Sequence, residues 1–153
     1  MQKRPPYLRS LLLQRFNWIE ERGLQLARAH GYSKVTPAMS RLLGNMAGRP
    51  LGLSELARRM GISRQAVHKL ANEVAKLGLV EFVASPDDLR VVLLQFTKAG
   101  WAMSAQAAKD FEELEADLRQ YLGARDLDEL KRLLSVPWDI KEKAAAAVRA
   151  QQP

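Results

Sequence analysis

Apolar residues recur every three or four positions near the beginning of the chain, a spacing that places them on one face of a helix. The series consists of Leu8, Leu12, Phe16 and Ile19. Pro5-Pro6 precedes it, where proline is tolerated in a first helical turn, and Gly31 follows it in the manner of a helix end. The pattern predicts one long helix from about Tyr7 to His30.

A second helix is predicted after Thr36-Pro37, because threonine caps helix N-termini and proline suits the first helical position. Its expected buried face is Met39, Leu42, Leu43 and Met46. The glycines of the stretch from Gly48 to Gly52 interrupt the chain after it. We therefore expect this helix to end before residue 48.

Two more short helices are predicted, capped by Ser54 and Ser63 and joined by a tight turn at Gly61-Ile62. The first ends near Met60 and the second near Leu77. The side chains expected to pack the pair together are Leu56, Ala57, Ile62, Val67, Leu70, Val74 and Leu77. Two helices joined by a turn of three or four residues with glycine are typical of a helix-turn-helix.

Two β-like runs follow, Leu79–Ala84 and Val91–Phe96, separated by the turn-rich segment 85–90. They predict a β-hairpin with a charged tip. A hairpin directly after a helix-turn-helix makes the unit a winged helix. The expected fold class is therefore mostly α (α+β), with a winged helix-turn-helix lobe over residues 36–100.

The last third of the chain is again helical in pattern. Thr97 is placed to cap a long helix to about Leu122, and Asp126 with Glu129 resembles a capping box for the next one. Pro137 should kink or split that segment, and the alanines of residues 144–147 favour a final helix. We expect a single domain over 1–153, in which 1–35 and 101–153 form a dimerisation part.

Charge is concentrated in the first two-thirds of the chain. The protein has 24 Lys and Arg against 17 Asp and Glu, but residues 1–100 hold 16 basic and 7 acidic side chains. Because these basic residues alternate with apolar ones, they indicate a folded basic surface rather than a disordered arm. Such a surface favours a polyanionic partner.

Several classes of function are disfavoured by composition. The chain has no cysteine, which excludes disulfides, a zinc ribbon and thiol-based redox sensing, and its two histidines lie outside any metal-ligand spacing. Neither a nucleophile–base pair nor a glycine-rich phosphate loop is visible, so we expect no enzyme activity, no metal and no cofactor. Without a signal peptide or a membrane-spanning apolar run, the expected location is cytoplasmic.

The helix expected after Ser63 is the predicted recognition helix. Its polar face opposes the apolar stripe, and arginine reads guanine while glutamine and asparagine read adenine. Residues near the helix start usually meet base edges, which favours Arg64, Gln65 and His68, whereas lysines suit phosphates. The predicted contact set is Ser63, Arg64, Gln65, His68, Lys69 and Asn72. A merely solvated helix face is the competing interpretation, and it applies most to His68.

The region Leu53–Gly100 resembles the multiple-antibiotic-resistance regulator (MarR) family. The resemblance lies in Leu56–Val67 as the helix-turn-helix, in Gly78-Leu79-Val80, and in Asp88-x-Arg90 followed at fixed spacing by Leu94, Thr97 and Gly100. Two positions depart from the family pattern. Leu89 stands where a basic wing residue is common, and Phe96 replaces a leucine.

This resemblance implies a bacterial-type transcription regulator that binds a pseudo-palindromic duplex as a homodimer. By position, Arg90 would enter the minor groove and Asp88 would orient it through a salt bridge, although Asp88 alternatively only stiffens the hairpin. The family commonly acts as repressors that release DNA when a small aromatic anion binds. Trp18, Tyr32 and Met39 are candidates for lining such a crevice, or are simply core residues. The sequence leaves repression versus activation open.

Apolar residues in the terminal helices independently favour a dimer, because two peripheral helices of a small monomer have little surface on which to bury them. They are Leu8, Leu11, Leu12, Phe16, Leu127, Leu130, Leu133 and Trp138. An intramolecular core is the alternative. For the whole protein, the alternative to DNA binding is a winged-helix module whose basic face docks an acidic protein.

Overall fold

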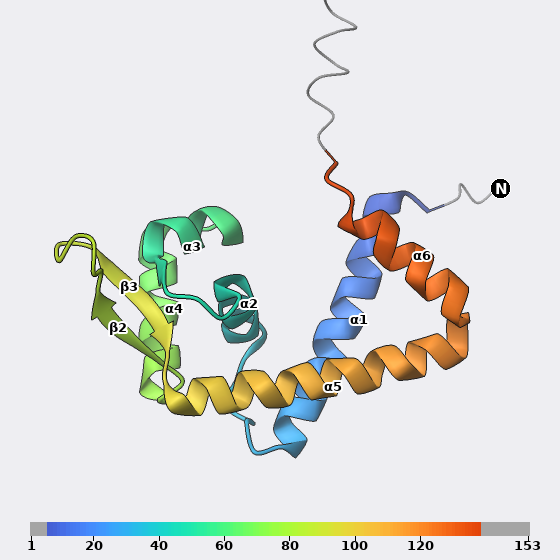
Figure 1. Ribbon diagram of the computed structural model, residues 1–153, viewed down its shortest axis with the longest axis horizontal. Coiled ribbons are helices and arrows are strands. Elements are labelled where there is room, and N and C mark those ends of the chain that lie inside the picture. Colours follow the sequence, from blue (N-terminus) through green and yellow to red (C-terminus); the bar gives the residue numbers. More distant parts are fainter. Residues whose placement is uncertain (1–5, 139–153) are drawn as a thin grey trace, which may run out of the picture. The chain divides into compact units, whose positions relative to one another are not determined.

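The computed structural model describes residues 6–138, which fall into two compact units divided between Glu112 and Glu113. The predicted helix over Ala144–Ala147 lies outside the described residues. Figure 1 shows the elements of the first unit, which contains four helices, a small sheet and the first part of a fifth helix. The elements are α1 (Leu8–Ala29), α2 (Pro37–Met46), β1 (Leu51–Gly52), α3 (Leu53–Met60), α4 (Arg64–Lys76), β2 (Val80–Ala84), β3 (Val92–Phe96) and α5 (Lys98–Leu122). The fold class is the predicted one, a mostly helical winged helix.

Local capping fixes several boundaries where the sequence predicts them. The Thr36 side chain accepts a hydrogen bond from the Met39 N–H at the start of α2, and Ser63 accepts one from Ala66 N–H at the start of α4. Each side chain thereby satisfies one of the donors that a helix start leaves free. Gly61 ends α3 with φ +66°, a left-handed conformation that suits glycine in this tight turn.

Two predicted caps are wrong. Ser54 does not begin α3, because the chain is extended at Gly52 and the helix starts at Leu53, which places Ser54 inside the first turn. At the other end of the protein, α6 (Ala124–Ser135) starts directly after Gly123 without a side-chain cap. Asp126 therefore lies within its first turn, and Glu129 instead pairs with Arg132 at 2.7 Å.

The sheet contains a strand that the sequence analysis missed. Its order is β1-β3-β2, and all neighbours are antiparallel. β1 is only two residues long and pairs Leu51 with Leu94 and Gly52 with Leu93. So short a strand has no periodicity of its own and depends on β3 for its hydrogen bonds. The β2–β3 hairpin is the predicted wing, within one residue at each strand start.

The hydrophobic core of the first unit lies between α2, α3, α4 and the sheet. Its fully buried large side chains are Leu42, Met46, Leu56, Val67, Val74 and Leu94. The predicted packing set is correct for Leu56, Ala57, Val67 and Val74, and Leu70 and Leu77 are partly buried against this core. The predicted packing of Ile62 between the two helices is wrong. Its side chain is 41% exposed, because it lies in the turn, and Ala71 on α4 is buried instead.

The start of α5 is joined tightly to the end of α4. Thr97 Oγ1 donates to the carbonyl of Gly78 at 2.6 Å and accepts from the Gly100 N–H at 3.0 Å. A Cβ placed on Gly100 would lie 1.9 Å from the Leu79 carbonyl oxygen, so only glycine permits this approach. One hydroxyl group therefore connects the exit of the predicted recognition helix with the first turn of the long helix.

The second unit consists of the end of α5 and α6. Ion pairs join the two helices, from Arg119 to Asp128 at 2.6 Å and between Lys131 and Glu115. Leu127 is buried, and α6 ends before Pro137, as proline requires. Within residues 6–138, no helix is both long enough and apolar enough to cross a membrane.

Candidate nucleic-acid interface

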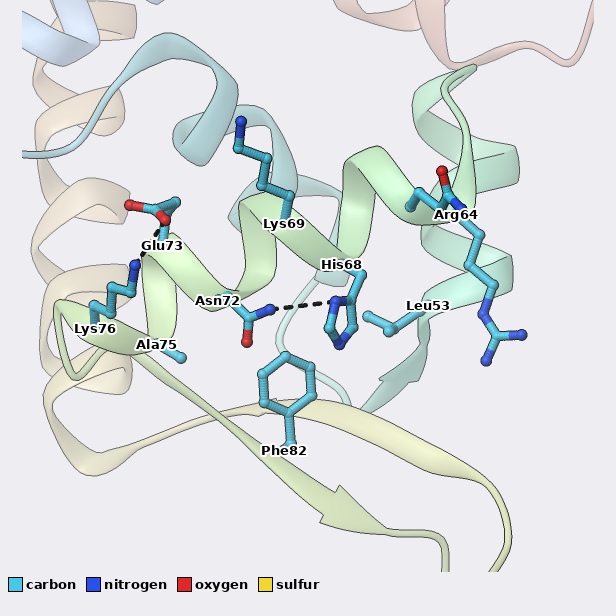
Figure 2. A pocket seen from close by; sticks show the side chains of 10 residues that line it. Leu53, Arg64, His68, Lys69, Asn72, Glu73, Ala75, Lys76 and Phe82 are labelled. Carbon is cyan, nitrogen blue, oxygen red and sulfur yellow. Dashed lines mark hydrogen bonds and ion pairs between the residues drawn. The ribbon is translucent and has the colours of Figure 1, made fainter.

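A broad groove lies along the exposed side of α4, beside the wing. Its volume is about 980 Å³. It is lined by five of the predicted contact residues, Arg64, Gln65, His68, Lys69 and Asn72, together with Leu53, Glu73, Ala75, Lys76 and Phe82. Figure 2 shows these side chains, with Arg64 near one end of α4 and Lys76 near the other. The structure therefore brings the predicted recognition residues together on one face.

His68 is held from two sides on this face. Its Nδ1 lies 3.2 Å from Asn72 Nδ2, one helical turn away, and its ring centroid lies 5.8 Å from that of Phe82 on β2 (Figure 2). With neutral imidazole protonated on Nε2, Asn72 donates to Nδ1 and its carbonyl oxygen remains free to accept. The arrangement orients two hydrogen-bonding side chains toward the groove and ties the helix to the wing.

The basic side chains of the groove differ in whether a carboxylate pairs with them. Lys76 Nζ pairs with Glu73 at 2.9 Å, which neutralises part of its charge. Within the described residues, Arg64 and Lys69 have no carboxylate within ion-pair distance, and both side chains are exposed. These two side chains therefore present unpaired positive charge on the groove side of α4.

Ser63 lies at the beginning of this helix, where its Oγ accepts the Ala66 N–H at 3.1 Å. A hydroxyl that accepts one bond still has its own hydrogen to donate. The capping role and the predicted contact role are therefore compatible.

The wing presents Arg90 differently from the expectation. The resemblance implied a salt bridge from Asp88 to Arg90, which is absent within residues 6–138. Instead, the backbone N–H of Arg90 donates to Asp88 Oδ1 at 3.0 Å. An aspartate side chain commonly bonds the backbone two residues later and so stabilises a turn. Asp88 thus shapes the wing tip, and the Arg90 side chain is exposed. Leu89 beside it is 80% exposed.

A cluster of charged side chains, Glu55, Arg58 and Arg59, connects α3 with the end of α2. Glu55 accepts hydrogen bonds from Arg58 and Arg59, and Arg59 also donates to the Asn45 carbonyl at 2.9 Å, near the end of α2. The hydrogen bonds from the two guanidinium groups lower the pKa of Glu55 to about 2. The cluster links α3 to α2 and thereby helps to hold the lobe that positions α4.

Sequence reasoning missed four residues of the groove. Phe82, Leu53, Glu73 and Ala75 line it together with the predicted set. The alternation of β2 gave a signal for Phe82, because side chains on one face of a strand share a direction. Its partnership with His68 depends on how the wing folds back toward α4, which no local pattern contains.

The MarR family model matches residues 33–90, which include α2, α3, α4 and the wing up to Arg90. Over these residues the chain is similar to the MarR family.

Curated relatives match this chain over part of their length. An uncharacterised protein of Mycobacterium tuberculosis is 37% identical over 65 residues, which are 42% of this chain and 46% of that protein. The uncharacterised HTH-type transcriptional regulator YhbI of Bacillus subtilis is 31% identical over 81 residues, 53% of each chain. The chain thus spans about half the length of the curated relatives it matches.

Solved structures support the same fold over most of the chain. Wild-type MarR from Escherichia coli has a TM-score of 0.68 at 20% identity, over 86% of this chain and 96% of that one. NadR in complex with 4-hydroxyphenylacetate has a TM-score of 0.68 at 20% identity, over 88% and 94%. At this level of identity, the likeness establishes the winged-helix fold alone.

Proposed function

We propose that the protein is a transcription regulator that binds double-stranded DNA as a homodimer and responds to a small molecule. The observation that carries the proposal is the groove along α4, where Arg64, Gln65, His68, Lys69 and Asn72 line one face. Arginine, glutamine and asparagine are the side chains best suited to read base edges in the major groove.

The wing supports a second contact with the duplex. Arg90 is exposed on the hairpin that follows α4, with its backbone fixed by Asp88. An arginine inserted into a narrow minor groove is attracted by the negative potential concentrated there. We propose that α4 reads base edges, that Arg90 enters the adjacent minor groove, and that Lys69 contacts phosphate.

Exposed apolar residues support the homodimer. In α1, Leu8, Leu11 and Phe16 of the predicted interface set are exposed, as are Leu130, Leu133 and Trp138 in and after α6, whereas Leu12 is half-buried and Leu127 is buried within the single chain. Each unit thus presents apolar surface that a second copy would cover. A two-fold dimer would bind two half-sites about one helical turn apart.

Selection of bound duplexes from a random pool tests these statements together. We expect enrichment of a pseudo-palindrome, with affinity that falls steeply as salt rises because bound lysine and arginine release counterions. Absence of duplex binding at low salt, combined with tight binding to an acidic protein, would instead identify a protein-docking module.

The small-molecule response is supported by a second cavity in the first unit. It has a volume of about 550 Å³ and is bounded by residues of α1, α2 and α5. Of the three predicted crevice residues, Tyr32 lines it, Met39 lies in the core and Trp18 is exposed on α1. Its volume falls in the range of pockets that hold small organic molecules. We propose that occupancy of this cavity modulates DNA binding.

A further inference from the structure

The cavity between α1, α2 and α5 has apolar walls. They are formed by Phe16, Leu24, Ala27, Leu43, Met103 and Phe111. Such walls favour an aromatic or aliphatic body, and a few polar groups then decide which ligand binds and how it is oriented. The chemical class of the ligand therefore depends on the polar side chains among them.

Glu20 on α1 is the decisive polar group. Its Oε2 atom is buried and has no hydrogen-bond partner within the described residues. A buried acceptor without a donor is unfavourable, and most such atoms in proteins are satisfied. Desolvation raises the pKa of this carboxyl group, although the positive charge of Arg41 opposes the effect. A ligand that brings an N–H group to Oε2 would satisfy it and would favour its charged form.

A second carboxylate increases the negative charge of the cavity. Asp110 on α5 is 4% exposed and also lines it. Its oxygens are already engaged, because Gln106 donates to Oδ1 at 2.9 Å and His30 Nδ1 lies 3.2 Å from Oδ2. Asp110 is therefore fixed in place as a nearby acceptor, while Glu20 still has an acceptor to offer.

Among the described residues, Arg41 is the one basic residue that lines the cavity, and its side chain is exposed. Both Arg41 and Glu20 also border a smaller neighbouring hollow of about 400 Å³. A carboxylate ligand would gain from Arg41 but would meet Glu20 and Asp110 inside. An ammonium group would meet two carboxylates and one guanidinium group, so the balance of charge in the cavity favours a cation.

We propose that this cavity binds a small apolar molecule with an amine head, such as an arylalkylamine, in preference to an aromatic carboxylate. The amine donates to Glu20 Oε2, and its apolar body lies against the walls. The inference rests on the proposed function only for its effect on DNA binding, since occupancy of the cavity is measured without DNA.

Isothermal titration of the full chain with 2-phenylethylamine and with 3-phenylpropionate tests the preference. The two probes share a ring and a two-carbon spacer and differ in the charge of the head group. We expect the amine to bind at least about tenfold more tightly, an energy difference of about 1.4 kcal/mol. Equal affinities, or tighter binding of the carboxylate, would overturn the proposal.

The variant Glu20→Gln keeps the shape of the side chain and removes its charge. We expect it to bind the amine about tenfold more weakly and the carboxylate no more weakly than the wild type does. Glu112→Gln is the matched control, because Glu112 is exposed on α5 next to the lining residue Phe111 and does not line the cavity. Unchanged amine binding in Glu20→Gln would contradict the assignment.

A second variant keeps the test independent of how well Glu20→Gln folds. Ala107 lines the cavity from α5, and Ala107→Leu fills part of it without changing any charge. We expect this variant to lose amine binding while its circular dichroism remains that of the wild type. Retained affinity in a folded Ala107→Leu protein would place the ligand elsewhere and reject the proposal. These results leave the proposed DNA binding untouched, because no duplex is present.

Discussion

Gly100 is a single position that limits how the two halves of the winged helix meet. A side chain there would overlap the Leu79 carbonyl, and Phe96 lies 2.9 Å from the same point. Backbone atoms cannot move aside as a flexible side chain can. The helix start must therefore shift away from the exit of α4 if any other residue is placed here.

Replacement of Gly100 by alanine is expected to destabilise the protein by about 3 kcal/mol or more, as overpacking at a rigid site does. Gly44 is the matched control, because it lies in α2 with open space around its Cα. Gly44→Ala should stabilise the fold by about 0.4–1 kcal/mol, since alanine loses less backbone entropy. Urea unfolding of the two variants measures both values, and equal stabilities would contradict this account.

Glu55 gives the fold a dependence on pH. Hydrogen bonds from Arg58 and Arg59 lower its pKa from the usual 4.5 to about 2, so the ionised form is favoured in the folded state. A carboxyl group with a lowered folded pKa stabilises the protein above its unfolded pKa, and this contribution is lost as the pH falls through the folded value.

We expect Glu55→Gln to be less stable than the wild type at pH 7, with a difference that shrinks between pH 4.5 and pH 2. Thermal unfolding across this pH series measures it. Glu21→Gln serves as the control at an exposed position on α1. A stability difference between Glu55→Gln and the wild type that is constant over the series would show that the ionised carboxylate is not the stabilising group.

At the scale of elements, local chemistry predicts the helices well and the small sheet poorly. Thr36 and Ser63 cap their helices as their sequence context suggests, because a cap involves only the next three residues. Ser54 is an equally suitable capping residue, but it does not cap α3. The pairing of Leu51 and Gly52 with β3 fixes where the chain enters this helix. That pairing joins residues more than 40 positions apart.

The groove along α4 shows the same difference between what local sequence predicts and what depends on distant contacts. The position of Arg64 and Asn72 on one face of α4 follows from helical spacing. The contact of His68 with Phe82 and the backbone bond of Asp88 depend on the folded hairpin and its tip. Sequence reasoning therefore identified most residues of the proposed site but not how they are oriented.

The two proposed DNA-contacting elements should respond differently to mutation. Arg64→Ala is expected to cost about 1–3 kcal/mol on the selected duplex and much less on a scrambled one, because it removes a base contact. Arg90→Ala should weaken binding to both duplexes by similar factors. Fluorescence anisotropy measures the four affinities, with Arg22→Ala on α1 as a control of equal charge change. If both variants bind as the wild type does, the interface is not at α4 and the wing.

At the scale of the whole molecule, apolar residues remain uncovered in a single copy of the chain. Trp138 is 56% exposed, and Leu130, Leu133 and Leu134 are exposed in α6. Monomers rarely leave a group of large apolar side chains in water. In the proposed dimer, the second copy covers these side chains and removes them from water.

Leu133→Asp is expected to convert the dimer to a monomer, because an unpaired charge would be buried at the interface. The substitution should leave the fold of each chain intact, since Leu133 is already exposed. Light scattering after size-exclusion chromatography measures the mass, and Gln120→Asp is the control at another exposed position. A monomeric wild type, or a dimeric Leu133→Asp variant, would contradict the proposal.

The hydrogen bonds of the Thr97 hydroxyl group couple the position of α4 to that of α5. It fastens the exit of α4 to the first turn of α5, and the same helix forms a cavity wall as far as Phe111. At about 1.5 Å per residue, that wall extends some 20 Å from the fastening point. A tilt of about 10° over this length moves the cavity end of α5 by roughly 3 Å relative to the fastening point. In the proposed function, α5 is the element through which a ligand in the cavity would act on α4.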